Sequence, residues 1–596
     1  MTASDRAPSP PGAAALWRRV TTPRALLFAG ALALAAMLFV PFHVARKTPP
    51  IPSFHSEAAA VALGLLALTA LLPFAGRLPL PRVLGLILGF VALLLLQILL
   101  GMPAYRQQAL LAALYLLWAA GLSVLAALLR RELGLERTVA VLAWSLFAGA
   151  VASSIIGLAQ HLGSYAFLGR FMVVASKERA WGNLAQPNHL ADYLSLGLVS
   201  AAYLYATDRL RLAYALIAGS LALYVLALTD SRTPWLYLGT LVALAAAFFA
   251  AERSREHRRL LVAALAGMAT FLVLPALMDL FGEFMSLQRA EMRPLGIRLR
   301  LWQTAWLLFL DAPVLGQGYR QYGLENFLLN ADLPPPRVIG FTDHAHNLVL
   351  NVMAEFGLVG LALLLAGTLL WGAGLLRQAR TAQLWWLCGI ASVLAIHSLL
   401  EYPLWYAFFL GPAALVLGLG EARALELPAA ERRSRRTRLA LAAMLVLGWV
   451  SLGQVFRDYV YMENFATLRY KYLHATAEMN RQAREVLLQI PRSSLLAPWV
   501  DLGLARGIPV SAEGLRDKLA VNRAAMRGFP IDDVVYRQAM LLALAGDEPG
   551  ARRQWDRAVA SFPREREAAA LVLRRRVEDG VDALRPLLEH AQAATQ

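Results

Sequence analysis

The sequence predicts an all-α, polytopic membrane protein with a soluble α-helical domain at its C-terminal end. Of its 596 residues 58% are hydrophobic, and the mean hydropathy of +0.52 is too high for a soluble enzyme of this length. Apolar runs of about 18 to 24 residues recur between residues 25 and 455, and a helix of that length crosses a bilayer. The last part of the chain, residues 456–596, is polar and has the pattern of helices.

We expect about thirteen membrane-spanning helices in a transmembrane domain of residues 25–455. They lie near residues 25–42, 57–76, 80–100, 108–129, 138–160, 190–206, 212–229, 234–251, 260–281, 347–372, 383–400, 403–420 and 439–455. A short segment, residues 1–24, precedes them, and a long polar connection, residues 282–346, lies between two of them. Because the first apolar run has no small-residue cleavage site, we expect it to remain as a span and not to be removed as a signal peptide.

Arginines gather in alternate connections between these spans, as they do in membrane proteins with a fixed orientation. Examples on one side are Arg130 with Arg131, the group in residues 253–259 and the dense run in residues 432–438. By the positive-inside rule this side is cytoplasmic, together with residues 1–24, whereas the connection 282–346 and the tail 456–596 are on the outer side. The formal net charge of +17 therefore reflects topology and does not indicate nucleic-acid binding.

The C-terminal tail contains one candidate repeat unit, in residues 532–563. Ala551 and Trp555 are spaced for one face of a helix, and Gly546 allows a turn ahead of that helix. This arrangement resembles a single tetratricopeptide-type helical hairpin, in which small residues let two helices approach closely. A tetratricopeptide-like domain and an irregular helical cap are both compatible with residues 456–596.

The most informative polar stretch, residues 343–347, lies where the long connection enters the span 347–372. It contains His344, His346 and Asn347. Ionisable groups at that depth are costly and usually functional, and histidine titrates near neutrality. His346 could accept a proton from an attacking hydroxyl, and the alternative is a pair of interfacial histidines solvated by water. Two histidines two residues apart, without a further His/Cys cluster, do not indicate a metal site.

Three arginines are also predicted on the arginine-poor outer side. Arg298 precedes an amphipathic stretch, Arg232 lies in a tight turn between two spans, and Arg179 precedes a run of amides. A guanidinium can pair with phosphate oxygens through two parallel hydrogen bonds, which would suit a phosphate-bearing ligand. The alternatives are contact with lipid headgroups for Arg298 and an ion pair with Asp230 for Arg232.

Two further groups combine amides, a carboxylate and aromatic residues. Gln186 and Asn188 precede the span 190–206, where they could hydrogen-bond a polar ligand such as a sugar. The alternative is that Asn188 only caps the helix. Glu401 and Tyr402 lie in a short connection between two spans. Tyrosine is typical of membrane interfaces, but a carboxylate at that place needs a partner.

Sequence motifs for several other chemistries are absent. The chain has no glycine-rich phosphate loop, nucleophile elbow, zinc-protease helix or dinucleotide fingerprint. Its single cysteine, Cys388, excludes disulfides within the chain. We expect no metal and no cofactor. An outward-facing enzyme without ATP must use an activated substrate, so arginines, amides and a histidine together suit transfer from a phosphate-activated donor carried by a lipid.

Several of these residues match the motifs of a known family. They are Arg298 with Trp302 four residues later, residues 312–318 (APVLGQG), residues 344–347 (HAHN) and residues 355–360 (EFGLVG). Together they resemble the Wzy/WaaL superfamily of O-antigen ligases, O-antigen polymerases and protein O-oligosaccharyltransferases. Residues 182–190 and the block 401–403 resemble the PglL/PilO-type branch of protein O-oligosaccharyltransferases more closely. The resemblance covers roughly residues 140–420.

The resemblance implies a GT-C-like, inverting glycosyltransferase in the bacterial inner membrane, with its active site and its C-terminal domain facing the periplasm. Its donor would be an undecaprenyl-diphosphate-linked glycan, and its acceptor an exported, pilin-like protein. It further implies His346 as the catalytic residue, Arg298 and Arg232 as residues that bind the donor diphosphate, and Gln186 and Tyr402 as residues that position the substrates. From their places in the same polar stretches we also expect Arg179 to bind the diphosphate and His344, Glu401 and Asn347 to position the substrates.

Other functions stay open from the sequence. The nearest is ligation of O-antigen to lipid A-core, which uses the same donor, and the next is polymerisation of the glycan. A lipid or solute transporter is the alternative from another class, although a transporter would place its ionisable residues near mid-span and show repeat symmetry. We expect the connection 282–346 to cover the donor as a lid and the domain 456–596 to help select the acceptor.

Overall fold

The computed structural model describes residues 22–164, 169–174, 179–280, 295–333, 340–426, 431–470 and 477–593. Most of the predicted segment 1–24 and two parts of the predicted connection 282–346, residues 282–294 and 334–339, lie outside the described residues. The described chain is almost entirely helical, as predicted. Its two short strands, β1 (Pro79–Leu80) and β2 (Leu425–Glu426), form one antiparallel pair.

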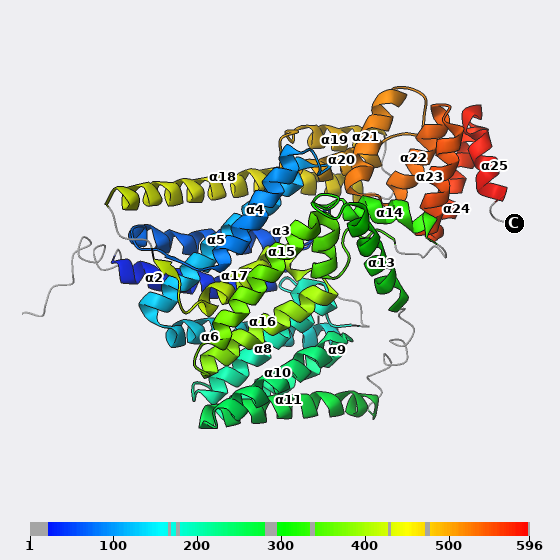
Figure 1. The fold of residues 1–596 in the computed structure, drawn as a ribbon. Helices are drawn as coiled ribbons and strands as arrows, with labels where there is room; N and C mark the ends of the chain where they lie inside the picture. The colour runs from blue at the N-terminus through cyan, green and yellow to red at the C-terminus, as the bar shows by residue number, and fades with distance from the viewer. Residues whose placement is uncertain are drawn as a thin grey trace, which may run out of the picture.

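A bundle of long helices forms the larger part of the molecule, and a group of short helices extends it on one side (Figure 1). The bundle consists of α2 (Pro23–Met37), α3 (Phe54–Leu68), α4 (Val83–Leu99), α5 (Arg106–Leu133), α6 (Leu135–His161), α8 (Pro187–Ala206), α9 (Leu212–Leu228), α10 (Thr233–Ala251), α11 (Arg255–Leu280), α15 (Leu348–Leu376), α16 (Ala382–Leu400), α17 (Ala407–Gly420) and α18 (Glu431–Tyr470). Its 3-10 turns are η1 (Val40–His43), η2 (Thr69–Phe74), η3 (Gly182–Leu184) and η4 (Pro403–Trp405).

The short helices come from the long connection and from the tail. The connection supplies α13 (Leu295–Asp311) and α14 (Tyr322–Asp332). The tail supplies α19 (Ala477–Leu488), α20 (Ala497–Arg506), α21 (Leu515–Gly528), α22 (Asp532–Leu544), α23 (Glu548–Ser561), η5 (Pro563–Glu565), α24 (Arg566–Glu578), η6 (Asp582–Leu584) and α25 (Arg585–Ala593).

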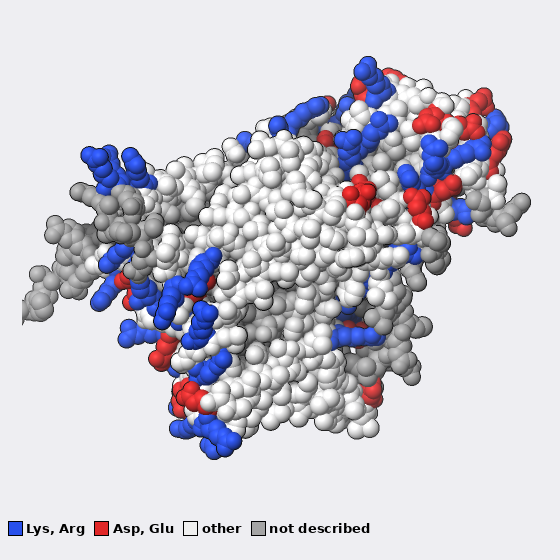
Figure 2. All heavy atoms as spheres, viewed as in Figure 1, with Lys and Arg blue, Asp and Glu red and all other residues white. Residues whose placement is uncertain are grey.

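Within the described part of the chain, 9 helices are long and apolar enough to cross a membrane, and α4, α9 and α17 are apolar but shorter. The surface agrees with this assignment. Figure 2 shows few charged side chains over the middle of the bundle, whereas Lys and Arg gather toward its ends and on the C-terminal helices. The prediction of a polytopic helical membrane protein is therefore confirmed, and the number of thirteen spans stays a prediction.

The predicted span 190–206 corresponds to α8, which lies in the interior of the bundle. This helix packs against α6, α9, α10, α11 and α16, and most of its side chains are buried. Its Asp192 pairs with His397 of α16 at 2.7 Å, and both side chains are fully buried. Burial of a charged group is tolerated when the group is paired. α8 can therefore be more polar than a helix that faces lipid.

Helix α15 is interrupted at Gly357, whose backbone has φ 62° and ψ −155°. The motif 312–318 fills the break, because Leu358 donates its N–H to the carbonyl of Pro313 at 2.8 Å. Backbone groups released by the break are thus paired within the protein, as they must be at membrane depth. A β-carbon at Gly357 would lie 2.5 Å from the backbone of Val314. The glycine therefore permits the close packing of the motif against α15.

Replacing Gly357 with alanine is expected to destabilise the protein by about 2 kcal/mol or more, since the backbone conformation and the contact with Val314 both exclude a side chain. Gly372→Ala in the same helix is the matched control, because nothing lies within 4 Å of its added β-carbon. Thermal unfolding of both variants in detergent checks this. Gly357→Ala should unfold at a lower temperature than the wild type, and equal unfolding temperatures for the two variants would contradict the packing account.

Helix α18 passes through the predicted boundary between the membrane domain and the tail. The predicted span 439–455 lies inside it, and the helix continues beyond residue 456 without a break. Near its end Glu463 accepts hydrogen bonds from Arg46 at 3.2 and 2.8 Å and lies 2.8 Å from His55. α18 is thus a continuous connection that is fixed to the bundle, and the domain boundary at 455/456 stays a prediction.

The C-terminal helices α22 and α23 form a helical hairpin at the residues of the candidate repeat. Trp555 packs edge-to-face on Tyr536, with ring centroids 4.9 Å apart, and Asp547 caps α23 by accepting the N–H of Gly550 at 2.9 Å. Phe327 of α14 joins the same hydrophobic core. The described part of the predicted lid is therefore anchored, because α14 packs on the C-terminal helices and α13 packs on α15.

Candidate active site

Residues from five separate segments meet at the end of the bundle that adjoins the C-terminal helices. The segments are the chain before α8, the turn between α9 and α10, the helix α13, the chain before α15 and the chain between α16 and α17. Each of them carries polar residues that the predicted topology assigns to the outer side. Hydrogen bonds and ion pairs join them around one carboxylate, that of Glu401.

The Glu401 carboxylate contacts three residues that are far apart in the sequence. His346 donates from Nδ1 to Oε2 at 2.8 Å, Asn188 donates from Nδ2 to Oε1 at 3.0 Å, and Nη2 of Arg298 lies 3.5 Å from Oε1. Burial alone would raise the pKa of Glu401, but the hydrogen bond from His346 and the nearby positive charges lower it to about 2. Glu401 is therefore an anion at neutral pH, and it connects the predicted catalytic histidine to a predicted phosphate-binding arginine.

The local sequence explains why Glu401 lies at this point. α16 ends at Leu400, and the N–H of Glu401 still bonds the carbonyl of His397 at 2.7 Å. Glu401 itself is extended, with φ −148° and ψ −158°. Pro403 disfavours a helical conformation for Tyr402, so the chain leaves the helix there and turns the carboxylate toward the segment before α15.

His346 adopts a left-handed backbone conformation, with φ 49°. This conformation is uncommon outside glycine and is often found at functional sites. It is maintained on both sides: Asn351 accepts the N–H of Ala345 at 2.9 Å, and Asn347 caps α15 by accepting the N–H of Leu350 at 3.1 Å. The side chain of His346 keeps 24% of its surface exposed. Since Nδ1 contacts Glu401, Nε2 is the nitrogen left to meet a substrate.

Asn347, for which we expect a substrate-positioning role, has structural contacts in this arrangement. In addition to its cap on α15, it donates from Nδ2 to the carbonyl of Leu399 at 3.2 Å. This bond ties the start of α15 to the end of α16. Asn347 therefore fixes the distance between the two segments that carry His346 and Glu401.

A second group of residues lies on the other side of His346. The rings of His344 and Tyr402 pack together, with centroids 3.3 Å apart. Asp343 lies 3.2 Å from His344 and forms an ion pair with Arg320 at 2.7 Å. Burial would raise the pKa of Asp343, but the charge of Arg320 lowers it below its usual value. This group is thus an anion–cation pair packed against a histidine and a tyrosine.

His344 is neutral at physiological pH. Burial lowers its pKa from 6.5 to about 4, although the charge of Asp343 opposes the shift. A neutral His344 adds no positive charge beside His346. The same burial raises the pKa of Tyr402 to about 12, which keeps its hydroxyl protonated.

The lowered pKa of His344 predicts a contribution to pH-dependent stability. The unfolded histidine binds its proton as the pH falls below about 6.5, whereas the folded one does so only near pH 4, so stability is lost through this window. His344→Gln removes this titration. Its free energy of unfolding should therefore fall less than that of the wild type between pH 6.5 and pH 4, by up to about 3 kcal/mol. Unfolding measured across a pH series checks this, and parallel curves for the two proteins would contradict it.

The remaining predicted residues belong to the chain before α8 and to the turn between α9 and α10. Arg179 donates from Nε to the carbonyl of Thr229 at 2.8 Å and from Nη2 to that of Asp230 at 3.2 Å, so it fixes the turn between α9 and α10. Arg232, in the same turn, is exposed at the start of α10. Ser231 connects this turn to the Glu401 group by a hydrogen bond to Oδ1 of Asn188 at 2.8 Å.

The helix cap of α8 differs from the sequence-based alternative. Gln186, and not Asn188, caps this helix by accepting the N–H of His189 at 2.5 Å. Asn188 lies in the first turn, where its side chain is directed to Glu401. The expectation that Asn188 only caps the helix is therefore wrong, and Gln186 has at least this structural role.

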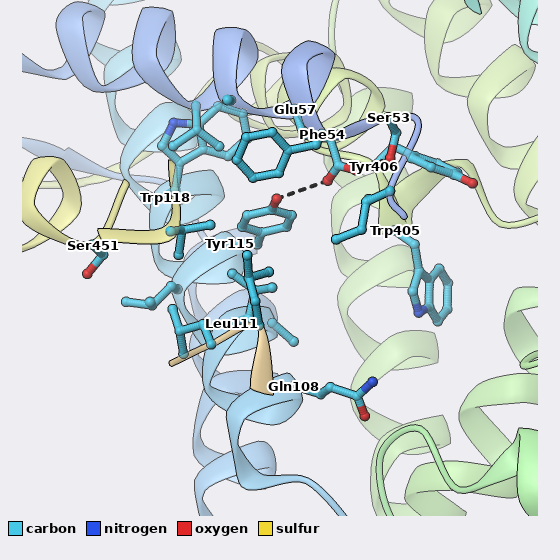
Figure 3. Close-up of a pocket in the computed structure, with 18 of the residues that line it drawn as sticks. Ser53, Phe54, Glu57, Gln108, Leu111, Tyr115, Trp118, Trp405, Tyr406 and Ser451 are labelled. Carbon is cyan, nitrogen blue, oxygen red and sulfur yellow. Dashed lines mark hydrogen bonds between the residues drawn. The ribbon is translucent and has the colours of Figure 1, made fainter. Parts of the chain in front are cut away.

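A cavity of about 530 Å³ opens beside His346. It is bounded by α3, α5, the segment before α15, η4, α18 and the chain at the start of α20, and His344 and Tyr402 also line it. Figure 3 shows part of its wall, in which Tyr115 of α5 faces Glu57 of α3. The tyrosine hydroxyl donates a hydrogen bond to the carboxylate at 2.9 Å. A space of this size can hold part of a substrate next to the histidine.

Among the described residues, no group of three or more His, Cys, Asp or Glu side chains is arranged to hold a metal ion.

Three family models match the chain over successive regions. The model described as "O-Antigen ligase" matches residues 217–365, that described as "Protein glycosylation ligase" matches 180–205, and that described as "Virulence factor membrane-bound polymerase, C-terminal" matches 385–576. A general O-oligosaccharyltransferase of Acinetobacter baylyi is 29% identical over 426 residues, which cover 69% of this chain and 72% of that protein.

The chain is thus similar to the O-antigen ligase superfamily. Its similarity is to the branch of the protein glycosylation ligases, so the enzyme is a membrane-bound glycosyltransferase, as the resemblance of its motifs implied. The three matched regions contain Glu401 and the residues that contact it, His346, Asn188 and Arg298, whereas Arg179 directly precedes the first region. The Glu401 group is therefore our candidate active site.

One residue of this site, Arg320, was not identified from the sequence. It follows the motif 312–318 closely and lies in the same arginine-poor connection as Arg298. An arginine on the arginine-poor side indicates a functional residue, so Arg320 could have been identified in the same way as Arg298 and Arg232. Its ion pair with Asp343 and its left-handed backbone, with φ 65°, depend on the folded structure and have no local sequence signal.

Proposed function

We propose that this enzyme transfers a preassembled glycan from an undecaprenyl-diphosphate carrier to Ser or Thr hydroxyls of exported proteins such as pilins, with inversion at the anomeric carbon. The observation that carries the proposal is the position of Glu401. Its carboxylate contacts the candidate base His346 and the candidate phosphate-binding residue Arg298 together. A base for the acceptor and a cation for the leaving group are the two elements that such a transfer needs.

On the donor side, Arg298 and Arg232 bind the diphosphate in this proposal, and Arg179 shapes the turn that presents Arg232. Charge develops on the phosphate oxygen as the glycan leaves, and guanidinium groups stabilise it more in the transition state than in the ground state. Arg298 lies 3.5 Å from Glu401 and keeps 42% of its side chain exposed, so a phosphate can still reach it. Gln186, which caps α8, positions the donor in this proposal.

On the acceptor side, the hydroxyl oxygen forms a bond to the anomeric carbon while the bond from that carbon to the phosphate oxygen breaks. The diphosphate departs with the electron pair, and the hydroxyl proton passes to Nε2 of His346. Glu401 holds the N–H at Nδ1, which keeps Nε2 unprotonated before the reaction and stabilises the imidazolium that forms. Tyr402 and His344 pack beside His346 and position the acceptor.

The enzyme is a multi-pass protein of the bacterial inner membrane in this proposal, with the site and the C-terminal helices in the periplasm. The distribution of charge supports this orientation. Lys and Arg side chains gather at the end of the bundle away from the C-terminal helices (Figure 2), and Arg253 and Arg432, in connections predicted to be cytoplasmic, are exposed. By the positive-inside rule that end is cytoplasmic.

A second candidate function is ligation of the glycan to lipid A-core. The match of the "O-Antigen ligase" model to residues 217–365 favours it, because this region contains Arg232, Arg298 and His346. The donor and the site chemistry would be the same, and only the acceptor hydroxyl would differ.

The experiment that tests the proposal offers both acceptors separately. Purified enzyme is mixed with undecaprenyl-diphosphate glycan and either a pilin-like protein or lipid A-core, and the products are identified by mass spectrometry. Glycan on a Ser or Thr of the protein is the expected result. Transfer to lipid A-core alone would overturn the protein acceptor but leave the site assignment standing, and transfer to neither would overturn both.

A further inference from the structure

The cavity beside His346 does not extend to the donor arginine Arg298. Its described lining includes His344, His346 and Tyr402, and it includes neither Arg298 nor Glu401. His346 therefore borders two regions: the Glu401 group, which Arg298 contacts, and a cavity lined mainly by apolar and aromatic side chains. The cavity wall also contains Arg320, but this guanidinium is paired with Asp343 at 2.7 Å.

The chemistry of inversion assigns different substrates to these two regions. The attacking oxygen and the departing phosphate oxygen lie on opposite sides of the anomeric carbon. If the arginines hold the phosphate and His346 takes the proton of the attacking hydroxyl, the acceptor must approach from the cavity side. This step rests on the function proposed above.

The C-terminal helices supply part of the cavity wall. Trp499 of α20 lines the cavity together with Phe341 and Trp405. The ring of Phe529 is tilted against two of these rings, with centroids 5.6 Å from Trp499 and 6.1 Å from Phe341. A hydrogen bond of 2.9 Å from Tyr105 at the start of α5 to Asp501 fixes α20 over the bundle. This part of the wall is thus an aromatic rim shared by the membrane bundle and the tail.

The interior combines apolar walls with a few polar groups. Leu111 and Ala112 of α5 form part of the wall, and Ser53, Gln108 and Glu57 supply hydroxyl, amide and carboxylate groups. Apolar walls with a few fixed polar groups are typical of sites that enclose a ligand. An extended peptide fits this composition, because its side chains contact the walls while its backbone needs hydrogen-bonding partners.

We propose that this cavity is the acceptor site, and that it holds an extended peptide segment with apolar residues on either side of the reacting Ser or Thr. Trp499 and Phe341 are specificity-determining residues in this assignment, since they contact the segment as it enters. The C-terminal helices then select the acceptor by direct contact beside His346.

The test separates the use of the acceptor from the use of the donor. The acceptor probe is a carrier protein with an unstructured tail that holds a single serine between alanines, and the donor is undecaprenyl-diphosphate glycan. Trp499→Ala removes part of the rim, and Ala112→Trp fills the interior. Leu110→Trp is the matched control on the same helix, because Leu110 is 37% exposed and does not line the cavity.

Both cavity variants should raise KM for the tail by about tenfold or more, because Trp499→Ala removes an aromatic contact with the tail and Ala112→Trp fills the space that the tail occupies. KM for the donor should stay within about twofold of the wild-type value. Leu110→Trp should change neither constant. An equal rise of both constants would overturn the assignment and place the isoprenoid chain of the donor in the cavity. Unchanged constants in both variants would also overturn it. If wild-type enzyme glycosylates neither this tail nor a pilin-like protein, it is the proposed function itself that fails.

Discussion

Replacing His346 with alanine is expected to slow glycan transfer about 10³-fold, because the attacking hydroxyl loses the group that accepts its proton. The affinity for the lipid-linked donor should change little, since the arginines that hold the diphosphate in our proposal lie on the other side of Glu401. Single-turnover transfer and donor binding, measured separately on the purified variant, check the two parts of this prediction.

His161→Ala is a suitable control for this variant. His161 ends α6 near the same end of the bundle and packs edge-on against Tyr224, with centroids 6.4 Å apart. Its replacement should leave transfer close to the wild-type rate. A loss of less than tenfold in His346→Ala, or an equal loss of donor binding, would show that His346 does not take the proton.

Glu401→Gln has the second largest expected effect, a fall of about 10² in the rate of transfer at saturating donor. The neutral amide cannot stabilise the imidazolium that forms on His346, and it can present an N–H where the carboxylate accepts one. The charge of Glu401 is therefore lost, and the hydrogen bond at 2.8 Å is kept only where the amide oxygen faces His346. Stopped reactions at several donor concentrations measure this effect apart from any change in KM.

Glu401→Asp tests which property of this side chain matters. It keeps the charge but shortens the side chain, so it should retain more activity than Glu401→Gln if charge is the main contribution. Activity of Glu401→Gln equal to that of the wild type would remove Glu401 from the mechanism and reduce it to a structural partner of Asn188 and Arg298.

Most of the fold could be predicted from hydropathy, because every helix that crosses a bilayer needs an apolar run of about twenty residues. All the predicted spans fall on helices, and the candidate repeat in residues 532–563 falls on the hairpin of α22 and α23. The continuation of α18 beyond residue 456 was not predicted, because a helix that leaves the membrane loses its apolar signal without losing its structure. The break of α15 at Gly357 also escaped prediction, since it depends on pairing with the distant residue Pro313.

The members of the candidate site were identified individually, but their arrangement was not. Arg298 and Arg232 could be chosen because arginine is rare on that side of the predicted topology, and His346 because histidine is costly at a membrane boundary. Nothing in the sequence indicates that Glu401 contacts both His346, which lies more than fifty residues away along the chain, and Arg298, which lies more than one hundred residues away. Such contacts arise only from tertiary packing, and the role of each residue stays a prediction until it is tested.

Glu401 acts on the reaction through His346 in the proposed mechanism. Single-turnover transfer at saturating donor should therefore be measured for His346→Ala, Glu401→Gln and the double variant, as a double-mutant cycle. If Glu401 acts through the histidine, the double variant will be about as slow as His346→Ala alone. If the two losses multiply, the residues act independently and the account is wrong.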